Sequence, residues 1–297
     1  MGHANKKSLV RQIQEKYDSK LAIGESKHAA KKLGISQEHI YSWDTYKSYM
    51  KQANYFAKYC KEEHGCKTLE QCRQYVDEYL LSRSHLSAYT QKLDAAALAK
   101  LYGCKSTDFV KTEARLRSNI TRSRGEYGER VHDRHFSLKK NSDLIEFCRS
   151  TGLRRAELEV LRGDKLIEKD GKYYIRVDAG SKGGRYREAP VTGNIDLVKS
   201  MMEKAGTGKV FGKVSNAADI HSYRADYAKA IYNEHARPID QIPYDRINKG
   251  SGKLYQSEVY CCRGDQKGVK YDKVAMQIAS EALGHNRISV VGEHYLY

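Results

Sequence analysis

The chain has 297 residues, of which 40% are hydrophobic and 30% charged, enough for two ordinary domains with their own cores. Its net charge is +16, and the excess is present in both halves. Residues 1–134 carry 25 Lys and Arg against 16 Asp and Glu, and residues 135–297 carry 28 against 21. This balance suits a protein that binds a polyanion, although a generally basic protein without such a partner would share it. The apolar runs are too short to cross a bilayer, and no apolar stretch follows Lys6 and Lys7 as a secretory signal requires.

The cysteines favour a reducing compartment. There are seven, an odd number, and no pair has the CxxC spacing, so a disulfide framework is not expected. Cys60, His64, Cys66 and Cys72 cluster in one stretch and raise the alternative of a zinc site. Their spacing matches no familiar zinc module, so we expect buried helix cysteines and no metal.

Residues 1–135 contain no proline, which favours long helices. A basic helix is predicted over 5–20, and apolar residues at helical spacing predict another over 43–63. Thr68 and Gln71 have the form of a capping box, so a further helix is expected to begin there. The last helix of this region runs from Ser87 to Leu101 and is ended by Gly103. The region is therefore predicted to be a compact domain of about four helices.

The boundaries of this helical domain are set by charge and composition. Residues 1–40 are predicted to be a basic extension, residues 41–125 the helical domain, and residues 126–297 the second domain. Residues 28–40 also have the Ala, Gly and Ile spacing of a helix-turn-helix, the alternative to a basic extension. The charged stretch 104–135, which includes Arg122 and Arg124, is predicted to be a linker.

The second domain is predicted to be α+β. Helices are expected over 143–150 and 154–162, followed by strands over 173–177 and 186–191 that a glycine-rich connection joins into a hairpin. Helices resume over 195–204, 223–234 and 274–283. One small hairpin among helices makes the whole chain mainly α with a small antiparallel sheet. Residues 235–273 are predicted to be an inserted loop or hairpin.

Four short motifs and a tyrosine follow one another in the second domain. They are Thr151-Gly152-Leu153-Arg154-Arg155-Ala156-Glu157-Leu158, the hairpin Ser181-Lys182-Gly183-Gly184-Arg185, His221-Ser222-Tyr223-Arg224, Ala282-Leu283-Gly284-His285 and Tyr295. Each motif is weak alone, but five in this order are specific. Over residues 140–297 the chain resembles the catalytic domain of tyrosine recombinases, the phage-integrase family. The ending is most similar to integrases of mobile elements in Gram-positive bacteria, and the upstream helices resemble the family's core-binding domain.

The resemblance implies a site that cleaves DNA without metal or cofactor. A phosphodiester under attack builds negative charge, which guanidiniums can clamp at any working pH. The implied catalytic residues are Arg154, Lys182, His221, Arg224, His285 and the nucleophile Tyr295, with Glu157 supporting them. Lys182 would protonate the leaving 5′-oxygen, and the histidines would bind the phosphate or manage the tyrosine's proton. Further DNA contacts are predicted at Arg155, Arg185, Arg187, Arg122 and Arg124.

Three features depart from the family pattern. The nucleophile usually lies nine positions after the LGH histidine, where this chain has His294, and Tyr295 is tenth. Tyr297 is therefore a rival nucleophile. The interval from Arg224 to His285 is longer than usual. Only two residues follow Tyr295, so we expect that the chain lacks the C-terminal segment that many relatives dock on the next subunit, or exchanges the tyrosine-bearing segment itself.

The implied function is site-specific recombination, the integration and excision of a mobile element through a 3′-phosphotyrosine intermediate and a Holliday junction. The implied partner is double-stranded DNA bearing a specific site, bound by four copies of a chain that is a monomer or weak oligomer when free. An accessory DNA-bending protein and a bacterial cytoplasmic, nucleoid-associated location are also expected. Two alternatives stay open: a non-catalytic DNA-binding protein of the same fold, and a DNA-relaxing enzyme similar to type IB topoisomerases.

Overall fold

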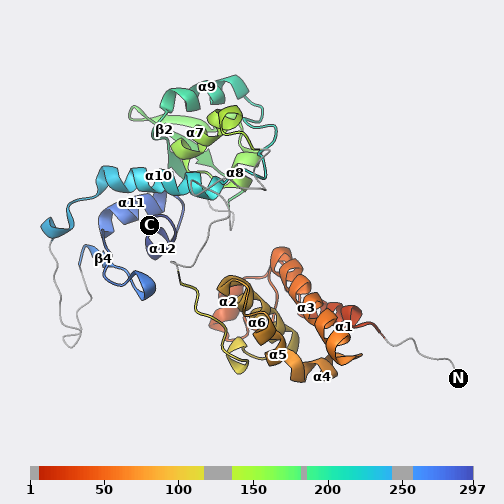
Figure 1. Ribbon diagram of the computed structural model, residues 1–297. Helices are drawn as coiled ribbons and strands as arrows, with labels where there is room; N and C mark the ends of the chain where they lie inside the picture. The colour runs from red at the N-terminus through yellow and green to blue at the C-terminus, as the bar shows by residue number, and fades with distance from the viewer. Residues whose placement is uncertain (1–6, 117–135, 182–185, 243–256, 297) are drawn as a thin grey trace. The chain divides into compact units, whose positions relative to one another are not determined.

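The computed structural model describes residues 7–116, 136–181, 186–242 and 257–296 (Figure 1). Its internal contacts divide the chain into two compact units, Met1–Ile120 and Thr121–Tyr297, each considered by itself. The predicted fold class is confirmed, because helices dominate both units and the second adds two small antiparallel sheets. None of the helices in the described ranges is long and apolar enough to cross a membrane.

The first unit is helical. Its helices are α1 (Leu9–Asp18), α2 (Lys27–Lys32), α3 (Trp43–His64), α4 (Leu69–Cys72), α5 (Val76–Ser82) and α6 (Ala88–Tyr102), with 3-10 turns η1 (Arg73–Tyr75) and η2 (Ser106–Asp108). The capping box predicted at Thr68 and Gln71 is confirmed at the start of α4. Gly103 ends α6 in the left-handed conformation, with φ of 67°, as predicted.

The prediction of a separate N-terminal extension is wrong for α1. Leu9, Ile13 and Tyr17 are buried in the same core as the residues of α3 and α6, and the Tyr17 hydroxyl donates to the Ala97 carbonyl at 2.8 Å. The helix-turn-helix alternative is also wrong. Residues 33–42 after α2 form no helix, and Ile40 pairs with Leu21 in an isolated bridge. The apolar side of a basic helix therefore packs on its neighbours and does not extend away from them.

The clustered cysteines belong to this core. Cys60, Cys66 and Cys72 are buried among apolar side chains. His64 stacks on the Tyr75 ring, with ring centroids 3.6 Å apart, and its Nε2 lies 3.0 Å from a carboxylate oxygen of Glu78. Within the described ranges, no three His, Cys, Asp or Glu side chains are grouped so that they could hold a metal ion.

The second unit begins with η4 (Lys139–Asn141), α7 (Ser142–Thr151), α8 (Arg155–Val160) and η5 (Gly163–Lys165). The three-stranded sheet follows as β1 (Leu166–Lys169), β2 (Lys172–Val177) and β3 (Arg187–Pro190), and then come α9 (Ile195–Ala205) and α10 (Ile220–His235). The remainder is η6 (Ile239–Gln241), β4 (Val259–Cys261), η8 (Gly264–Gln266), β5 (Lys270–Asp272), α11 (Lys273–Ala282) and α12 (Ser289–His294).

The sheet is larger than predicted. The expected hairpin is β2 paired with β3, with Ile175 opposite Ala189, and β1 adds a third antiparallel strand. Its turn with β2 is formed by Asp170 and Gly171, both with positive φ, at 52° and 71°. An Asp-Gly pair is typical of a hairpin turn, but the strand before it, β1, has only four residues, and two of these are exposed. The apolar pattern of β1 was too short to predict a strand.

Helix α10 joins the two cores of the unit. It contacts α7 on one side and α11 on the other (Figure 1). One core lies among α7, α8, the sheet and α9, and the other among α10, α11 and α12. The interval 235–273 contains the hairpin of β4 and β5, one of the two predicted alternatives. Arg237 pairs with Asp272 at 2.8 Å, which anchors the interval at the start of α11.

Candidate active site

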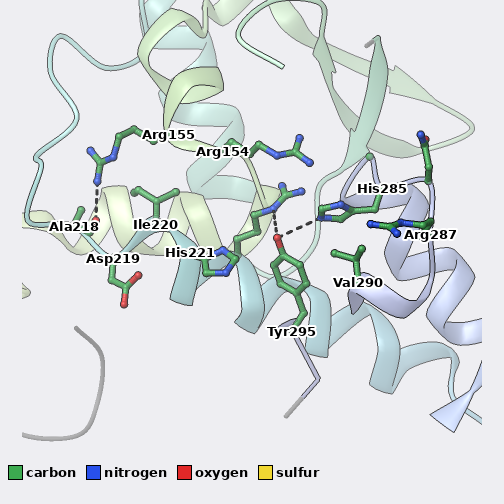
Figure 2. Close-up of a pocket in the computed structure, with 13 residues that line it drawn as sticks. Arg154, Arg155, Ala218, Asp219, Ile220, His221, His285, Arg287, Val290 and Tyr295 are labelled. Atoms are coloured by element: carbon green, nitrogen blue, oxygen red, sulfur yellow. Dashed lines mark hydrogen bonds between the residues drawn. The ribbon is translucent and has the colours of Figure 1, made fainter. Parts of the chain in front are cut away.

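Residues from the separated motifs of the second unit line one open pocket of about 750 Å³ (Figure 2). Five of the six predicted catalytic residues are among them: Arg154, His221, Arg224, His285 and Tyr295. They come from the start of α8, the first turns of α10, the connection of α11 to α12, and the residue after α12. The sixth, Lys182, lies outside the described residues. The lining is cationic, which suits a phosphate and not a metal ion.

The glycines of two motifs allow this convergence. Gly152 ends α7 with φ of 58°, and a Cβ there would lie 2.2 Å from an atom of the Tyr227 ring. Gly284 has φ of 67°, and a Cβ there would lie 2.7 Å from Cδ of Arg187. Each position therefore requires glycine for its backbone conformation and for the close approach of a side chain. The two turns also place the carbonyls of Gly152 and Leu283 within reach of the arginines.

Arg154 is held at the start of α8 by Glu157. The Glu157 carboxylate accepts from the Arg154 backbone N–H at 2.7 Å and from its Nη1 at 2.8 Å. Nη2 of Arg154 donates to the Leu283 carbonyl at 3.2 Å. The supporting role predicted for Glu157 fits this geometry, because one carboxylate fixes both the backbone and the side chain of the arginine.

Arg224 is almost fully buried, at 2% exposed. Its Nη1 donates to the Gly152 carbonyl and its Nη2 to the Leu283 carbonyl, so Leu283 joins both arginines. Burial lowers the pKa of Arg224 to about 10, and the charges of neighbouring arginines act in the same direction. The guanidinium therefore remains charged at neutral pH.

The Tyr295 hydroxyl lies between Arg224 and His285 (Figure 2). Nε of Arg224 donates to this oxygen at 3.4 Å, and Nε2 of His285 lies 3.3 Å from it. The ring of His221 meets the Tyr295 ring edge-on, with centroids 5.2 Å apart. Tyr295 is 4% exposed, whereas the His294 side chain, at the position where the family has its tyrosine, is 48% exposed. Tyr297 lies outside the described residues.

His285 is neutral at physiological pH. Burial and the positive charges of Arg224, Arg154 and Arg187 together lower its pKa to about 4, with burial the largest cause. A neutral imidazole can accept a proton, which a charged one cannot. The ring therefore combines hydrogen-bonding distance to a hydroxyl with the protonation state that a base requires.

Two of the predicted DNA contacts have other partners. Nη1 and Nη2 of Arg155 donate to the Ser215 and Ala218 carbonyls, each at 2.8 Å, so this arginine holds a loop at the pocket edge (Figure 2). Arg187, also predicted to contact DNA, is 9% exposed and pairs with Glu157. Three further predicted contacts lie outside the described residues: Arg122, Arg124 and Arg185.

The motifs did not predict Arg287 or the support of α12. Arg287 lines the pocket two residues after His285, and within the described ranges its side chain has no hydrogen bond or ion pair. The Tyr271 hydroxyl donates to the Leu296 carbonyl at 2.9 Å, so β5 contacts the chain next to Tyr295. A basic residue near the LGH motif was the only available signal for Arg287. Nothing in the sequence linked Tyr271 to Tyr295.

The chain has the fold of site-specific DNA recombinases and integrases. It is similar to the XerH site-specific recombinase bound to a palindromic difH substrate, with TM-score 0.50 and 14% identity over 97% of this chain and 91% of that one. It is also similar to the Tn1549 transposon integrase in complex with circular intermediate DNA, with TM-score 0.50 and 11% identity over 98% and 96%. No model of a protein family matches, and no curated protein does. The predicted resemblance to tyrosine recombinases is thereby confirmed in the fold.

Proposed function

We propose that the chain is a site-specific DNA recombinase that cleaves and rejoins DNA through Tyr295. One observation carries the proposal: the Tyr295 hydroxyl lies between Arg224 and His285 in a cationic pocket that Arg154 also lines. A phenol with a pKa near 10 is a weak nucleophile. A neutral base on one side and a guanidinium on the other are the groups that would activate it.

The proposed reaction is a transesterification. Oη of Tyr295 attacks the phosphorus, the bond from phosphorus to the 5′-oxygen breaks, and a 3′-phosphotyrosine forms. His285 accepts the tyrosine's proton, and Lys182, as its motif predicts, protonates the departing 5′-oxygen. Arg154 and Arg224 stabilise the charge on the non-bridging oxygens. Because the covalent bond retains the energy of the broken one, a 5′-hydroxyl can attack it and rejoin the strand without ATP.

Double-stranded DNA is the proposed partner. The basic composition of both halves supports it, as do the two similar structures, which are complexes with DNA. We further propose four copies on two sites, a Holliday junction, the integration and excision of a mobile element, and an accessory bending protein. These steps follow the predicted resemblance, as do the cytoplasmic location and the assignment of the helical unit to core binding.

Covalent capture tests the chemistry. The protein is incubated with nicked duplexes built from the ends of the DNA element that encodes it, and an SDS-resistant protein–DNA band is sought. Tyr295→Phe should abolish the band and Tyr297→Phe should retain it. If the band is lost only in Tyr297→Phe, the proposed function still holds but the nucleophile is Tyr297. Absence of a band in the wild type, on DNA that it binds, would favour the non-catalytic alternative.

A second substrate separates the proposed acid, Lys182, from the phosphate-binding arginines. When sulfur replaces the bridging 5′-oxygen, the leaving thiol has a pKa near 8.5, as in cysteine, and needs no proton donor. Lys182→Ala should therefore cleave this substrate at the wild-type rate but fail on ordinary DNA. Arg224→Ala should fail on both. Relaxation of any supercoiled plasmid, without preference for the element's ends, would favour the topoisomerase-like alternative.

A further inference from the structure

Arg187 begins β3, and its side chain is enclosed in the site. Its Nη1 and Nη2 donate to the two carboxylate oxygens of Glu157 at 2.7 and 2.8 Å. The same two oxygens accept from the backbone and Nη1 of Arg154. The buried carboxylate thus receives four charge-assisted or backbone hydrogen bonds, and two of them come from Arg187.

The stem of Arg187 also contacts the LGH turn. Its Cδ occupies the space that a Cβ on Gly284 would need. The carbonyl that precedes Gly284, that of Leu283, accepts from both Arg154 and Arg224. Arg187 therefore contacts two supports of the phosphate-binding arginines, namely the Glu157 carboxylate and the Leu283–Gly284 turn.

The charges explain why a second arginine is needed. If Glu157 had Arg154 as its sole partner, the carboxylate would neutralise that guanidinium and could rotate to bind it with both oxygens. Because Arg187 binds both oxygens in bidentate geometry, the guanidinium of Arg154 binds only one of them, through Nη1. The two guanidiniums and the carboxylate together keep a charge of +1. The site then keeps an excess of positive charge for a phosphate.

We propose that Arg187 is a positioning residue of the active site, which fixes Glu157 so that Arg154 stays oriented towards the phosphate, and that it does not contact DNA. This inference rests on the proposed function. It predicts that loss of Arg187 slows the covalent step while leaving DNA affinity nearly unchanged. At 9% exposed, the side chain offers little surface to a phosphate.

The first test measures rate and affinity in the full chain. Arg187→Met should lower the rate of covalent adduct formation at saturating DNA about 10- to 100-fold, the size of loss that follows removal of the hydrogen-bond partners that orient ligands in metal sites. The dissociation constant for DNA should change less than about threefold. Arg187→Lys keeps the charge but loses the bidentate geometry, so its rate of adduct formation should lie between those of the wild type and Arg187→Met. Arg176→Met, on the neighbouring strand and exposed, is the control and should cleave as the wild type does.

The second test is titration of His285, which reports whether the positive charge of Arg187 acts on the groups of the pocket. The groups around its ring are Tyr295, Arg224, Arg154, Arg187 and His294. Arg187 is one of the cations that lower the His285 pKa. Followed by NMR in DNA-free protein, this pKa should rise in Arg187→Met and stay low in Arg187→Lys. The acid limb of the cleavage profile should move to higher pH in the same variant.

Several outcomes would overturn the proposal. One is a wild-type rate of adduct formation in Arg187→Met. Another is a joint loss of DNA affinity and salt dependence in this variant, which would identify a phosphate contact. If Arg187→Met fails to fold, Arg187→Met combined with Glu157→Gln removes both buried charges, and the same rate loss is expected. Failure of the wild type to form any adduct would refute the proposed function, whereas the His285 titration would still test Arg187.

Discussion

Glu157 is predicted to make the stability of the second unit depend on pH. Its side chain is 1% exposed, and burial by itself would raise its pKa. The hydrogen bonds and charges of Arg187 and Arg154 outweigh burial and lower that pKa to about 2, from an ordinary value of 4.5. A depressed pKa stabilises the fold above pH 4.5, and this contribution is lost as pH falls towards 2. The full contribution is about 3 kcal/mol, and roughly 1 kcal/mol of it is lost by pH 3.5.

The substitution Glu157→Gln tests this magnitude. At pH 7 it leaves two arginines facing a neutral amide, and breaking such a buried pair costs about 3 to 5 kcal/mol. The difference in unfolding free energy between wild type and variant should therefore be large at pH 7. This difference should narrow by roughly 1 kcal/mol at pH 3.5, because the wild type alone loses the carboxylate's contribution.

Urea unfolding of the full chain measures the difference. The single tryptophan, Trp43, lies in α3 of the first unit, so its fluorescence reports that unit. A transition in circular dichroism without a change in fluorescence reports the second unit. Glu188→Gln, which removes a surface carboxylate on β3 that pairs with Lys169, is the matched control and should show no comparable pH dependence. An equal difference at both pH values, or a variant as stable as the wild type at pH 7, would refute the reasoning.

Three further substitutions have defined outcomes. Gly152→Ala should destabilise the second unit by about 2 to 5 kcal/mol in thermal unfolding, because the new methyl group clashes with Tyr227 and the backbone has a positive φ. Gly171→Ala is the control: its φ is 71° but no atom lies near the new methyl group, so it should cost about 1 kcal/mol. Arg287→Ala should lower the slope of log affinity against log salt by about one, measured by anisotropy on duplex DNA, and an unchanged slope would remove Arg287 from the interface. Tyr271→Phe should cost about 1 kcal/mol and slow adduct formation more than it weakens DNA binding, because it frees the backbone next to the nucleophile.

The sequence alone determined the class of fold and most of the candidate site. Capping residues and glycines act locally, so Thr68 and Gly103 marked helix ends from their neighbours alone. The order of the motifs identified Arg224 and Tyr295, which are 71 positions apart in the chain, as members of one pocket. The sequence could identify these residues because binding and cleaving a phosphodiester requires particular residue types.

Only the tertiary structure decided which basic residues face the pocket and which are internal partners. Arg155, Arg187 and Arg287 are alike in residue type, but their side chains have different contacts. Arg155 donates to loop carbonyls, and Arg187 pairs with Glu157. The Arg287 side chain lines the pocket and has no hydrogen-bond or ion-pair partner among the described residues. The partner of Arg187 lies 30 positions away, and no local pattern encodes that distance.

The same reason applies to elements that the sequence analysis missed or left as one of two alternatives. A four-residue strand such as β1 and the hairpin of β4 and β5 are stable only when paired, so their short apolar patterns carry little signal alone. Helix α1 reads as a basic extension until its apolar side meets the core of α3 and α6. Local propensity and chemical motifs are written in the sequence, whereas burial and the pairing of charges depend on contacts between distant segments, which exist only in the folded chain.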